Sequence, residues 1–184
     1  MNQPMNWSQT YTGAAFDYDN LDKHYYDVED FAHALSLLCR YNGHCTRFYS
    51  VAEHLVRCSF AAPEGFKFEA LMHDASEAYL SDMPRPLKNL MPEYRALEKK
   101  VEQAICNQFG LPFPMSSEVK EVDNRMLLLE KELIMSPPPF KWETYGVTPY
   151  PIGEWDYVTN FYPDMEDWRV AKSAFMRRFE QLRP

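Results

Sequence analysis

The chain has 184 residues, of which 46% are hydrophobic and 25% are charged, and its formal net charge is −8. This length is enough for one domain with a core of its own, and the composition is that of a globular chain, not a disordered one. The acidic balance argues against general binding of nucleic acid, which needs a basic surface. It leaves room for a small phosphorylated ligand, which needs only a local cluster of cations or a metal ion.

The sequence predicts neither a membrane segment nor a secretion signal. No apolar run approaches the roughly 20 residues that a membrane-spanning helix needs. The N-terminus, "MNQPMNWSQTYTG", lacks the basic start and the apolar stretch of a signal peptide. The cysteines are scattered without a CxxC spacing, at Cys39, Cys45, Cys58 and Cys106. We therefore expect reduced thiols and a cytoplasmic location.

Residues 1–25 predict a short β-hairpin, because aromatic and polar residues alternate around Gly13 in "TYTGAAFDYDN". From residue 26 to residue 135 the pattern predicts a helical core. Apolar residues recur at helical spacing from Val28 to Leu38. Ser50 and Glu53 then have the spacing of a capping box, which opens a second helix.

Three more helices are predicted in this core, at about 66–80, at 92–109 with Gly110 as its C-terminal stop, and at about 117–135. Residues 136–163 are rich in proline and aromatic residues and predict a loop, because proline density prevents a long helix. Residues 164–184 predict a final amphipathic helix. The expected fold is all-α: a single helical-bundle domain over residues 1–184 with an N-terminal β-hairpin.

The helix at 66–80 gathers polar groups on one face, where His73, Asp74 and Glu77 share a stripe with Ala70. A buried carboxylate without a partner is costly, so this stripe must face water or be paired. One interpretation is a solvated face with an ordinary i,i+4 polar pair. The other is a metal site in which nitrogen and oxygen ligands are mixed.

A metal site would need ligands from other helices, because adjacent helical residues diverge by about 100°. His54 on the second helix and Asp123 on the fifth are the candidates. Each also has an ordinary interpretation, since His54 could be a satisfied core or surface histidine and Asp123 a solvated aspartate. Taken together, the candidates form a set of two histidines and two aspartates on three helices.

In chain order this set reads H…HD…D, which resembles the HD-domain phosphohydrolases. The stretch "HDASEAYLSDMPRPLK" is similar to their HDxSE…DxPxPxK segment, and "KEVD" is similar to their KxxD. The stretch "CRYNGHCTRFYSVAEH" is similar to the segment that places an Arg–aromatic pair before the first metal histidine. The resemblance covers roughly residues 10–135. It is nearest to the phage and prophage deoxynucleotide phosphohydrolases, including dATP triphosphohydrolases, which are related to bacterial 5′-deoxynucleotidases.

The resemblance implies a role for each matching residue. Glu77 would be the catalytic general base. The metal ligands would be His54, His73, Asp74 and Asp123. The substrate contacts would be Arg40, Lys88 and Lys120 on phosphate, Tyr41 on sugar and base, Asp82 on the 3′-hydroxyl and Pro86 in the wall of the base pocket. Relatives often have tryptophan where this chain has Tyr41. His44 is left open between a phosphate contact, a proton carrier and a loop residue.

The implied activity is metal-dependent hydrolysis of a deoxynucleoside triphosphate, with dATP favoured, to deoxynucleoside and triphosphate. The alternatives are a 5′-deoxynucleotidase that acts on monophosphates and a non-catalytic, nucleotide-binding regulatory protein. The ligand set suits Zn, Co, Mn or Fe(II), and the triphosphate could bring an additional Mg. The expected partner is therefore a small-molecule deoxynucleotide, in the cytoplasm or, for a phage-encoded enzyme, the host cytoplasm. The C-terminal aromatic residues predict a homo-oligomer, a dimer or larger.

Overall fold

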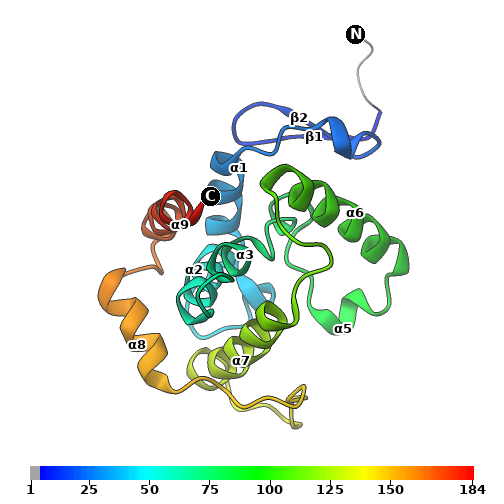
Figure 1. Ribbon diagram of the computed structural model, residues 1–184. Helices are drawn as coiled ribbons and strands as arrows, with labels where there is room; N and C mark the ends of the chain where they lie inside the picture. Colours follow the sequence, from blue (N-terminus) through cyan, green and yellow to red (C-terminus); the bar gives the residue numbers. More distant parts are fainter. Residues whose placement is uncertain (1–4) are drawn as a thin grey trace.

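The computed structural model describes residues 5–184 as a bundle of α-helices with one β-hairpin, which confirms the predicted all-α fold (Figure 1). The hairpin consists of β1 (Trp7–Gln9) and β2 (Ala15–Asp17). The helices are α1 (Val28–Leu37), α2 (Val51–Ala61), α3 (Lys67–Met72), α4 (Glu77–Leu80), α5 (Arg85–Lys88), α6 (Pro92–Phe109), α7 (Ser117–Ile134), α8 (Ile152–Phe161) and α9 (Trp168–Leu182), with short 3-10 turns at Leu21–Lys23 and Arg40–Gly43.

Helix α2 is the centre of the bundle and packs against α1, α3, α7, α8 and α9. The hydroxyl of Ser50 accepts a hydrogen bond from the backbone N–H of Glu53, as the capping spacing predicts. The carboxylate of Glu53 does not return to Ser50, because it accepts hydrogen bonds from Arg47 and Arg57 instead. Even polar residues of α2 are buried, His54 completely. Since buried polar groups need partners, α2 is the element on which a site can be organised.

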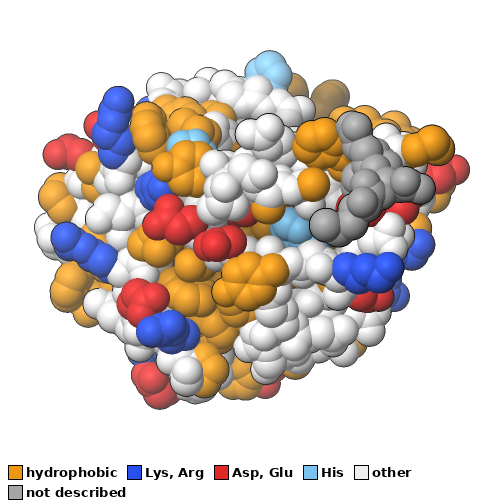
Figure 2. All heavy atoms as spheres, turned by 90° about the horizontal axis from the view of Figure 1, so that it is seen from above, with side chains coloured by type: hydrophobic (Ala, Val, Ile, Leu, Met, Phe, Trp, Pro, Cys, Tyr) orange, Lys and Arg blue, Asp and Glu red, His pale blue; other side chains and the backbone are white. Residues whose placement is uncertain are grey.

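The hairpin covers one end of the bundle. β1 and β2 pair antiparallel, with Ser8 opposite Phe16, and Gly13 takes a positive φ of 86° in the connection. Phe16 is fully buried and stacks on Tyr79 of α4 at 4.3 Å between ring centroids. Figure 2 looks down on this end, where charged side chains of both signs are interspersed with hydrophobic ones. Residues 1–4 of the predicted hairpin segment lie outside the described residues.

The prediction of one continuous helix at 66–80 is wrong, because α3 ends at Met72 and α4 begins at Glu77. The intervening turn is tightened by i→i−3 hydrogen bonds, from Ala75 N–H to Met72 and from Glu77 N–H to Asp74. The side chain of His73 takes the carbonyl of Ala70 at 2.8 Å, the acceptor that an uninterrupted helix would give to the N–H of Asp74. The candidate ligands His73 and Asp74 therefore lie on a turn between two helices.

The prediction of a loop throughout 136–163 is also wrong, since α8 occupies Ile152–Phe161. Every proline of this segment lies outside the helix, and Pro151 is its N-cap residue. No proline therefore interrupts the helical hydrogen bonds. Trp155 seats α8 on the bundle by packing on Tyr49 and under the guanidinium of Arg57. Helix α9 begins at Trp168, later than predicted. No helix within residues 5–184 has the length and apolar character needed to cross a membrane.

Candidate metal centre and adjoining cavity

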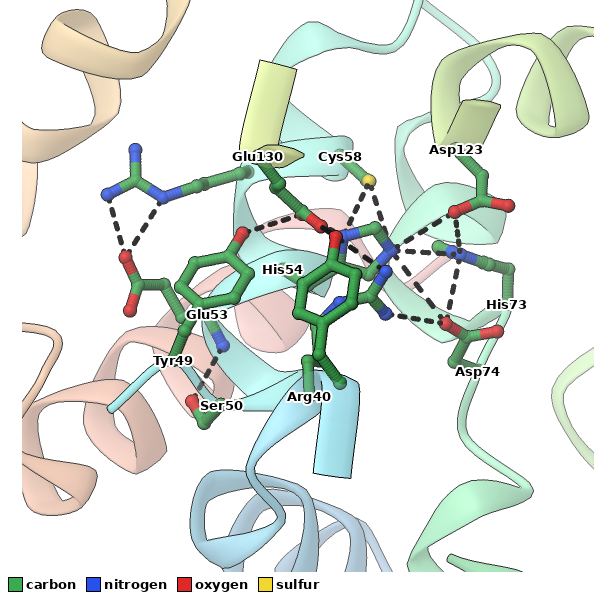
Figure 3. Close-up of polar contacts among 12 residues, drawn as sticks. Arg40, Tyr49, Ser50, Glu53, His54, Cys58, His73, Asp74, Asp123 and Glu130 are labelled. Carbon is green, nitrogen blue, oxygen red and sulfur yellow. Dashed lines mark hydrogen bonds and ion pairs between the residues drawn. The ribbon is translucent and has the colours of Figure 1, made fainter. Parts of the chain in front are cut away.

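Four side chains from three separate elements converge on one point (Figure 3). His54 comes from α2, His73 and Asp74 from the turn after α3, and Asp123 from α7. The two Nε2 atoms lie 3.4 Å apart. Asp123 Oδ1 lies 3.4 Å from Nε2 of His54 and 3.8 Å from that of His73, and Asp74 Oδ2 lies 3.8 and 3.4 Å from the same two atoms. The structure thus brings together the four residues of the H…HD…D set.

These separations fit coordination of a single divalent ion. Two ligand atoms that each lie about 2.1 Å from a zinc ion at a tetrahedral angle are about 3.4 Å apart. The separations between the nitrogens and from each nitrogen to the carboxylate oxygens, 3.4 to 3.8 Å, are at and slightly above that value. Two imidazole nitrogens with two carboxylate oxygens suit zinc, cobalt, manganese or ferrous iron. The donor set and its geometry therefore both fit such an ion.

An alternative set of ligands contains a thiol. The side chains of His54, Cys58 and His73 offer ligand atoms within 4.8 Å of one another. Cys58 Sγ lies 3.6 Å from Nε2 and 3.8 Å from Nδ1 of His54. An atom in line with the Nε2 lone pair would be much farther from Nδ1, so the sulfur lies beside the ring. Cys58 is also fully buried in an apolar cluster with Val122 and Met126. A divalent ion would therefore fit the carboxylate-containing set better than the set with the thiol.

Each histidine is fixed by a hydrogen bond on its other nitrogen. His73 Nδ1 lies 2.8 Å from the carbonyl oxygen of Ala70, and His54 Nδ1 lies 2.5 Å from Glu130 Oε1. Both partners are acceptors, so both Nδ1 atoms carry the proton. In the neutral rings this leaves the Nε2 lone pairs directed at the common point, which is the tautomer that a metal needs.

The local charges favour a cation at this point. Burial lowers the pKa of His73, but Asp74 and Asp123 outweigh that effect and raise it well above its ordinary value. Burial raises the pKa of Asp123, but hydrogen bonds from the two histidines hold it well below its ordinary value. Both carboxylates therefore stay ionised, and a divalent ion would take the place of imidazole protons.

Glu130 is a site residue that sequence reasoning missed. It is completely buried on α7, two helical turns after Asp123 on the same face. Burial raises its pKa, but Arg40 and His54 lower it to about 2. The available signal was a glutamate that ends the apolar run "MLLLE" at a heptad spacing from Asp123.

A cavity of about 590 Å³ opens beside the four ligands. Asp74 and Asp123 form part of its lining. The predicted residues that line it are Arg40, Tyr41, Glu77, Asp82, Pro86 and Lys88. Its remaining lining comes from α5 and the two residues before it, from α7 and from the segment after α7, and includes Arg85, Leu127, Met135, Trp142, Glu143 and Tyr145. The cavity thus has an acidic end at the ligands, three cations, and apolar walls.

Lys120 is the exception among the predicted residues. It is exposed on the first turn of α7 and is not part of the cavity lining, so the expected phosphate contact there does not fit the geometry. Arg85 stands in the cavity instead, 3.5 Å from Asp123 Oδ2 and over the ring of Tyr145 at 4.5 Å. His44 is exposed and also lies outside the lining.

Glu77 lies in the cavity with only 4% of its surface exposed. Lys88 Nζ approaches its Oε1 at 3.8 Å, and its Oε2 has no hydrogen-bond partner within residues 5–184. Burial, followed by the nearby Asp74 and Asp82 carboxylates, raises the pKa of Glu77 well above its ordinary value. A buried carboxylate with an unused oxygen is a good acceptor for a proton from a water or ligand in the cavity.

Comparison with known proteins places this chain among bacterial relatives. No protein-family model matches it. It is 46% identical over 127 residues to the uncharacterised protein YfdR of Escherichia coli K12, covering 69% of this chain and 71% of that protein. It is 34% identical over 142 residues to an uncharacterised protein of Rhodobacter capsulatus, covering 70% of this chain and 72% of that protein. The chain therefore belongs to the same family as YfdR.

Proposed function

We propose that this protein is a metal-dependent phosphohydrolase of the HD-domain type that acts on deoxynucleotides. The observation that carries the proposal is the approach of two carboxylates to a pair of imidazoles, with an oxygen of each carboxylate within 3.8 Å of both Nε2 atoms, at one end of a cavity that also holds a buried glutamate and three cations. The resemblance in the sequence supports the same conclusion, because the convergent residues are those of the H…HD…D set.

The chemistry follows from the positions of the residues. His54, His73, Asp74 and Asp123 would hold a divalent ion. Such an ion would lower the pKa of a water bound to it and would polarise a phosphoryl oxygen. Glu77 would accept the proton as water attacks the α-phosphorus, because it is buried in the same cavity with an unpaired oxygen. The bond from that phosphorus to the 5′-oxygen breaks, and the 5′-oxygen takes up a proton and leaves as the deoxynucleoside. Burial and the nearby carboxylates raise the pKa of Glu77, and the Lys88 ammonium, 3.8 Å away, offsets part of that rise in favour of the ionised form that a base needs.

The cations of the cavity would hold the phosphates. Arg40 lies 3.5 Å from Asp74, Lys88 lies beside Glu77, and Arg85 lies beside Asp123, so all three stand next to the reacting end. Arginine binds phosphate through paired donors, and lysine acts as a point charge. These cations also offset the −8 net charge, which repels a polyanion.

Three cations support a substrate with more than one phosphate, so a deoxynucleoside triphosphate, with dATP favoured, is the leading substrate. The expected products are the deoxynucleoside and triphosphate. Tyr41, Trp142 and Pro86 in the lining offer apolar surface for the base and sugar. The rival activity is hydrolysis of a deoxynucleoside monophosphate, and a non-catalytic nucleotide-binding role is the rival from another class. A reducing, cytoplasmic location is part of the proposal, in line with the free thiols of Cys39 and Cys45.

Incubation of the purified protein with each dNTP, NTP and dNMP tests this proposal. Each reaction would contain Co²⁺, Mn²⁺, Zn²⁺ or Mg²⁺, and the phosphate product would be identified by ion chromatography. Release of inorganic triphosphate from dNTPs supports the leading function, and release of phosphate from dNMPs alone supports the 5′-deoxynucleotidase. Nucleotide binding without any product, in all metals, would favour the regulatory role.

A homo-oligomer is also part of the proposal. Some C-terminal aromatic residues are covered within the chain, as Trp155 is by Arg57 and Tyr150 by Arg125. Tyr157 and Phe161 of α8 stay more than half exposed. Light scattering should give a multiple of the 21.7 kDa chain mass, and a monomer would contradict this part of the proposal.

A further inference from the structure

Glu130 connects the candidate metal centre to the wall of the cavity. Its Oε1 accepts hydrogen bonds from His54 Nδ1 at 2.5 Å and from the hydroxyl of Tyr49 at 2.8 Å. Its Oε2 accepts a hydrogen bond from the hydroxyl of Tyr41 at 2.5 Å and lies 3.3 Å from Arg40 Nη2. One side of this carboxylate therefore faces the metal ligand, and the other faces two residues of the cavity lining.

The side toward His54 decides how the imidazole can bind a cation. Glu130 is fully buried and offers only acceptor atoms, so His54 keeps its proton on Nδ1 and its lone pair on Nε2. A carboxylate partner of this kind also orients the ring and strengthens it as a ligand, and losing one typically weakens metal binding about 10- to 100-fold.

The side toward Arg40 and Tyr41 holds a strained segment in place. Tyr41 and Asn42 adopt left-handed backbone conformations, with φ of 57° and 52°. Such conformations are costly for residues other than glycine and persist only where surrounding contacts hold them. The bonds to Glu130 are such contacts, and Arg40 extends from the same carboxylate to Asp74 at 3.5 Å. His54, Glu130, Arg40 and Asp74 thus form a continuous chain of polar contacts.

We infer that Glu130 is a positioning residue that links affinity for the cation to affinity for the substrate. It fixes the metal-binding tautomer of His54 and, through its second oxygen, the orientation of Arg40 and Tyr41 toward the phosphorylated ligand. This inference rests on the proposed function. The cation is a first-row divalent metal, and the coupled ligand is the nucleotide that enters the adjoining cavity.

The variant Glu130→Gln tests the inference, because an amide has a single acceptor oxygen and cannot serve both pairs of donors. Tyr49→Phe is the matched control, since it removes one hydrogen bond from the same carboxylate and leaves those of His54, Arg40 and Tyr41. Titration with Co²⁺ alone should show binding weakened at least about 10-fold in Glu130→Gln and nearly unchanged in Tyr49→Phe. With substrate and saturating metal, KM should rise in Glu130→Gln and not in the control.

A merely structural role would lower thermal stability in both variants and leave the Co²⁺ affinity of each unchanged, and that result would overturn the inference. The wild-type chain adds a measurement that depends on no variant. Nitrogen-15 NMR of the Zn²⁺-loaded protein should show the proton of His54 on Nδ1, and a proton on Nε2 would also overturn the inference. If the wild-type chain binds no Co²⁺ or Zn²⁺ at all, the proposed function fails instead.

Discussion

Two sides of the cavity are built in different ways. The side at the four candidate ligands, with Glu130 behind them, is called the floor here. Its residues hold one another by several polar contacts, and His54 and Glu130 have no exposed surface. The adjoining side, which we call the outer wall, is formed by α5 and the segment after α7. There the side chain of Arg85 is 46% exposed, and Tyr145 is 37% exposed.

This difference separates two tasks. A metal site must hold its ligands within a fraction of an ångström, which requires buried side chains fixed by second partners. Recognition of a flexible, charged ligand tolerates and uses more mobile groups, because these can close around what is bound. We therefore expect changes in the floor to abolish activity and changes in the outer wall to alter affinity and selectivity.

The largest effect should come from Glu77→Gln at the edge of the floor. The substitution keeps the shape of the side chain and removes its ability to accept a proton, so kcat should fall about 100- to 10,000-fold. Metal content by elemental analysis should stay unchanged, because Glu77 is not one of the four ligands. Glu132→Gln, at an exposed glutamate of α7, is the control and should keep full activity. Retained turnover in Glu77→Gln would remove this residue from the mechanism.

A smaller effect is expected in the outer wall, where Arg85→Ala should raise KM for a dNTP about 10-fold, the value of one charge-assisted contact. The rise should be smaller for a dNMP, which has fewer phosphates to bind. Lys120→Ala is the matched control, because this cation lies outside the cavity lining. Steady-state kinetics on both substrates provide the measurement. Equal effects of the two substitutions would show that general surface charge, not the wall, governs binding.

The smallest effect is expected on the free energy of unfolding, from a substitution at Glu102 of α6, outside the cavity. Burial and the nearby Glu98 carboxylate raise the pKa of Glu102 from 4.5 to about 7. The folded state then holds this proton to a higher pH than the unfolded chain does, so the free energy of unfolding falls as the pH rises from 4.5 to about 7. Allowing for partial solvent screening, Glu102→Gln should stabilise the protein by about 1 kcal/mol at pH 8.

Urea unfolding of Glu102→Gln and wild type at pH 8 and at pH 4 measures this contribution. The gain should disappear at pH 4, where both states of the wild-type chain hold the proton. A gain of equal size at both pH values would mean that the substitution acts through packing and not through the charge of Glu102.

Much of the fold follows from local sequence signals. The capping residue Ser50, the stop at Gly110 and the helical apolar spacing located α2, α6 and α7 because these signals act within one or two turns. The break after Met72 could not be found this way. It depends on His73 taking the Ala70 carbonyl, a side-chain choice that is set by where the imidazole has to point.

The candidate site likewise contains residues that a sequence pattern identified and residues that only distant contacts reveal. The H…HD…D order identified residues that the fold then brings together, because the resemblance names those four positions directly. Glu130 was missed since its partners, Tyr41, Tyr49 and His54, come from distant parts of the chain. The sequence resemblance indicated Lys120 and not Arg85 as a phosphate contact. A motif does not show toward which side of α7 a lysine side chain lies.

Co²⁺ titration followed by absorption spectroscopy tests most directly whether His54, His73, Asp74 and Asp123 hold one divalent ion. We expect one ion per chain in the wild type and in Cys58→Ser, and loss of binding in His54→Ala and Asp123→Ala. Binding that survives in Asp123→Ala and disappears in Cys58→Ser would instead assign the ion to the set that contains the thiol.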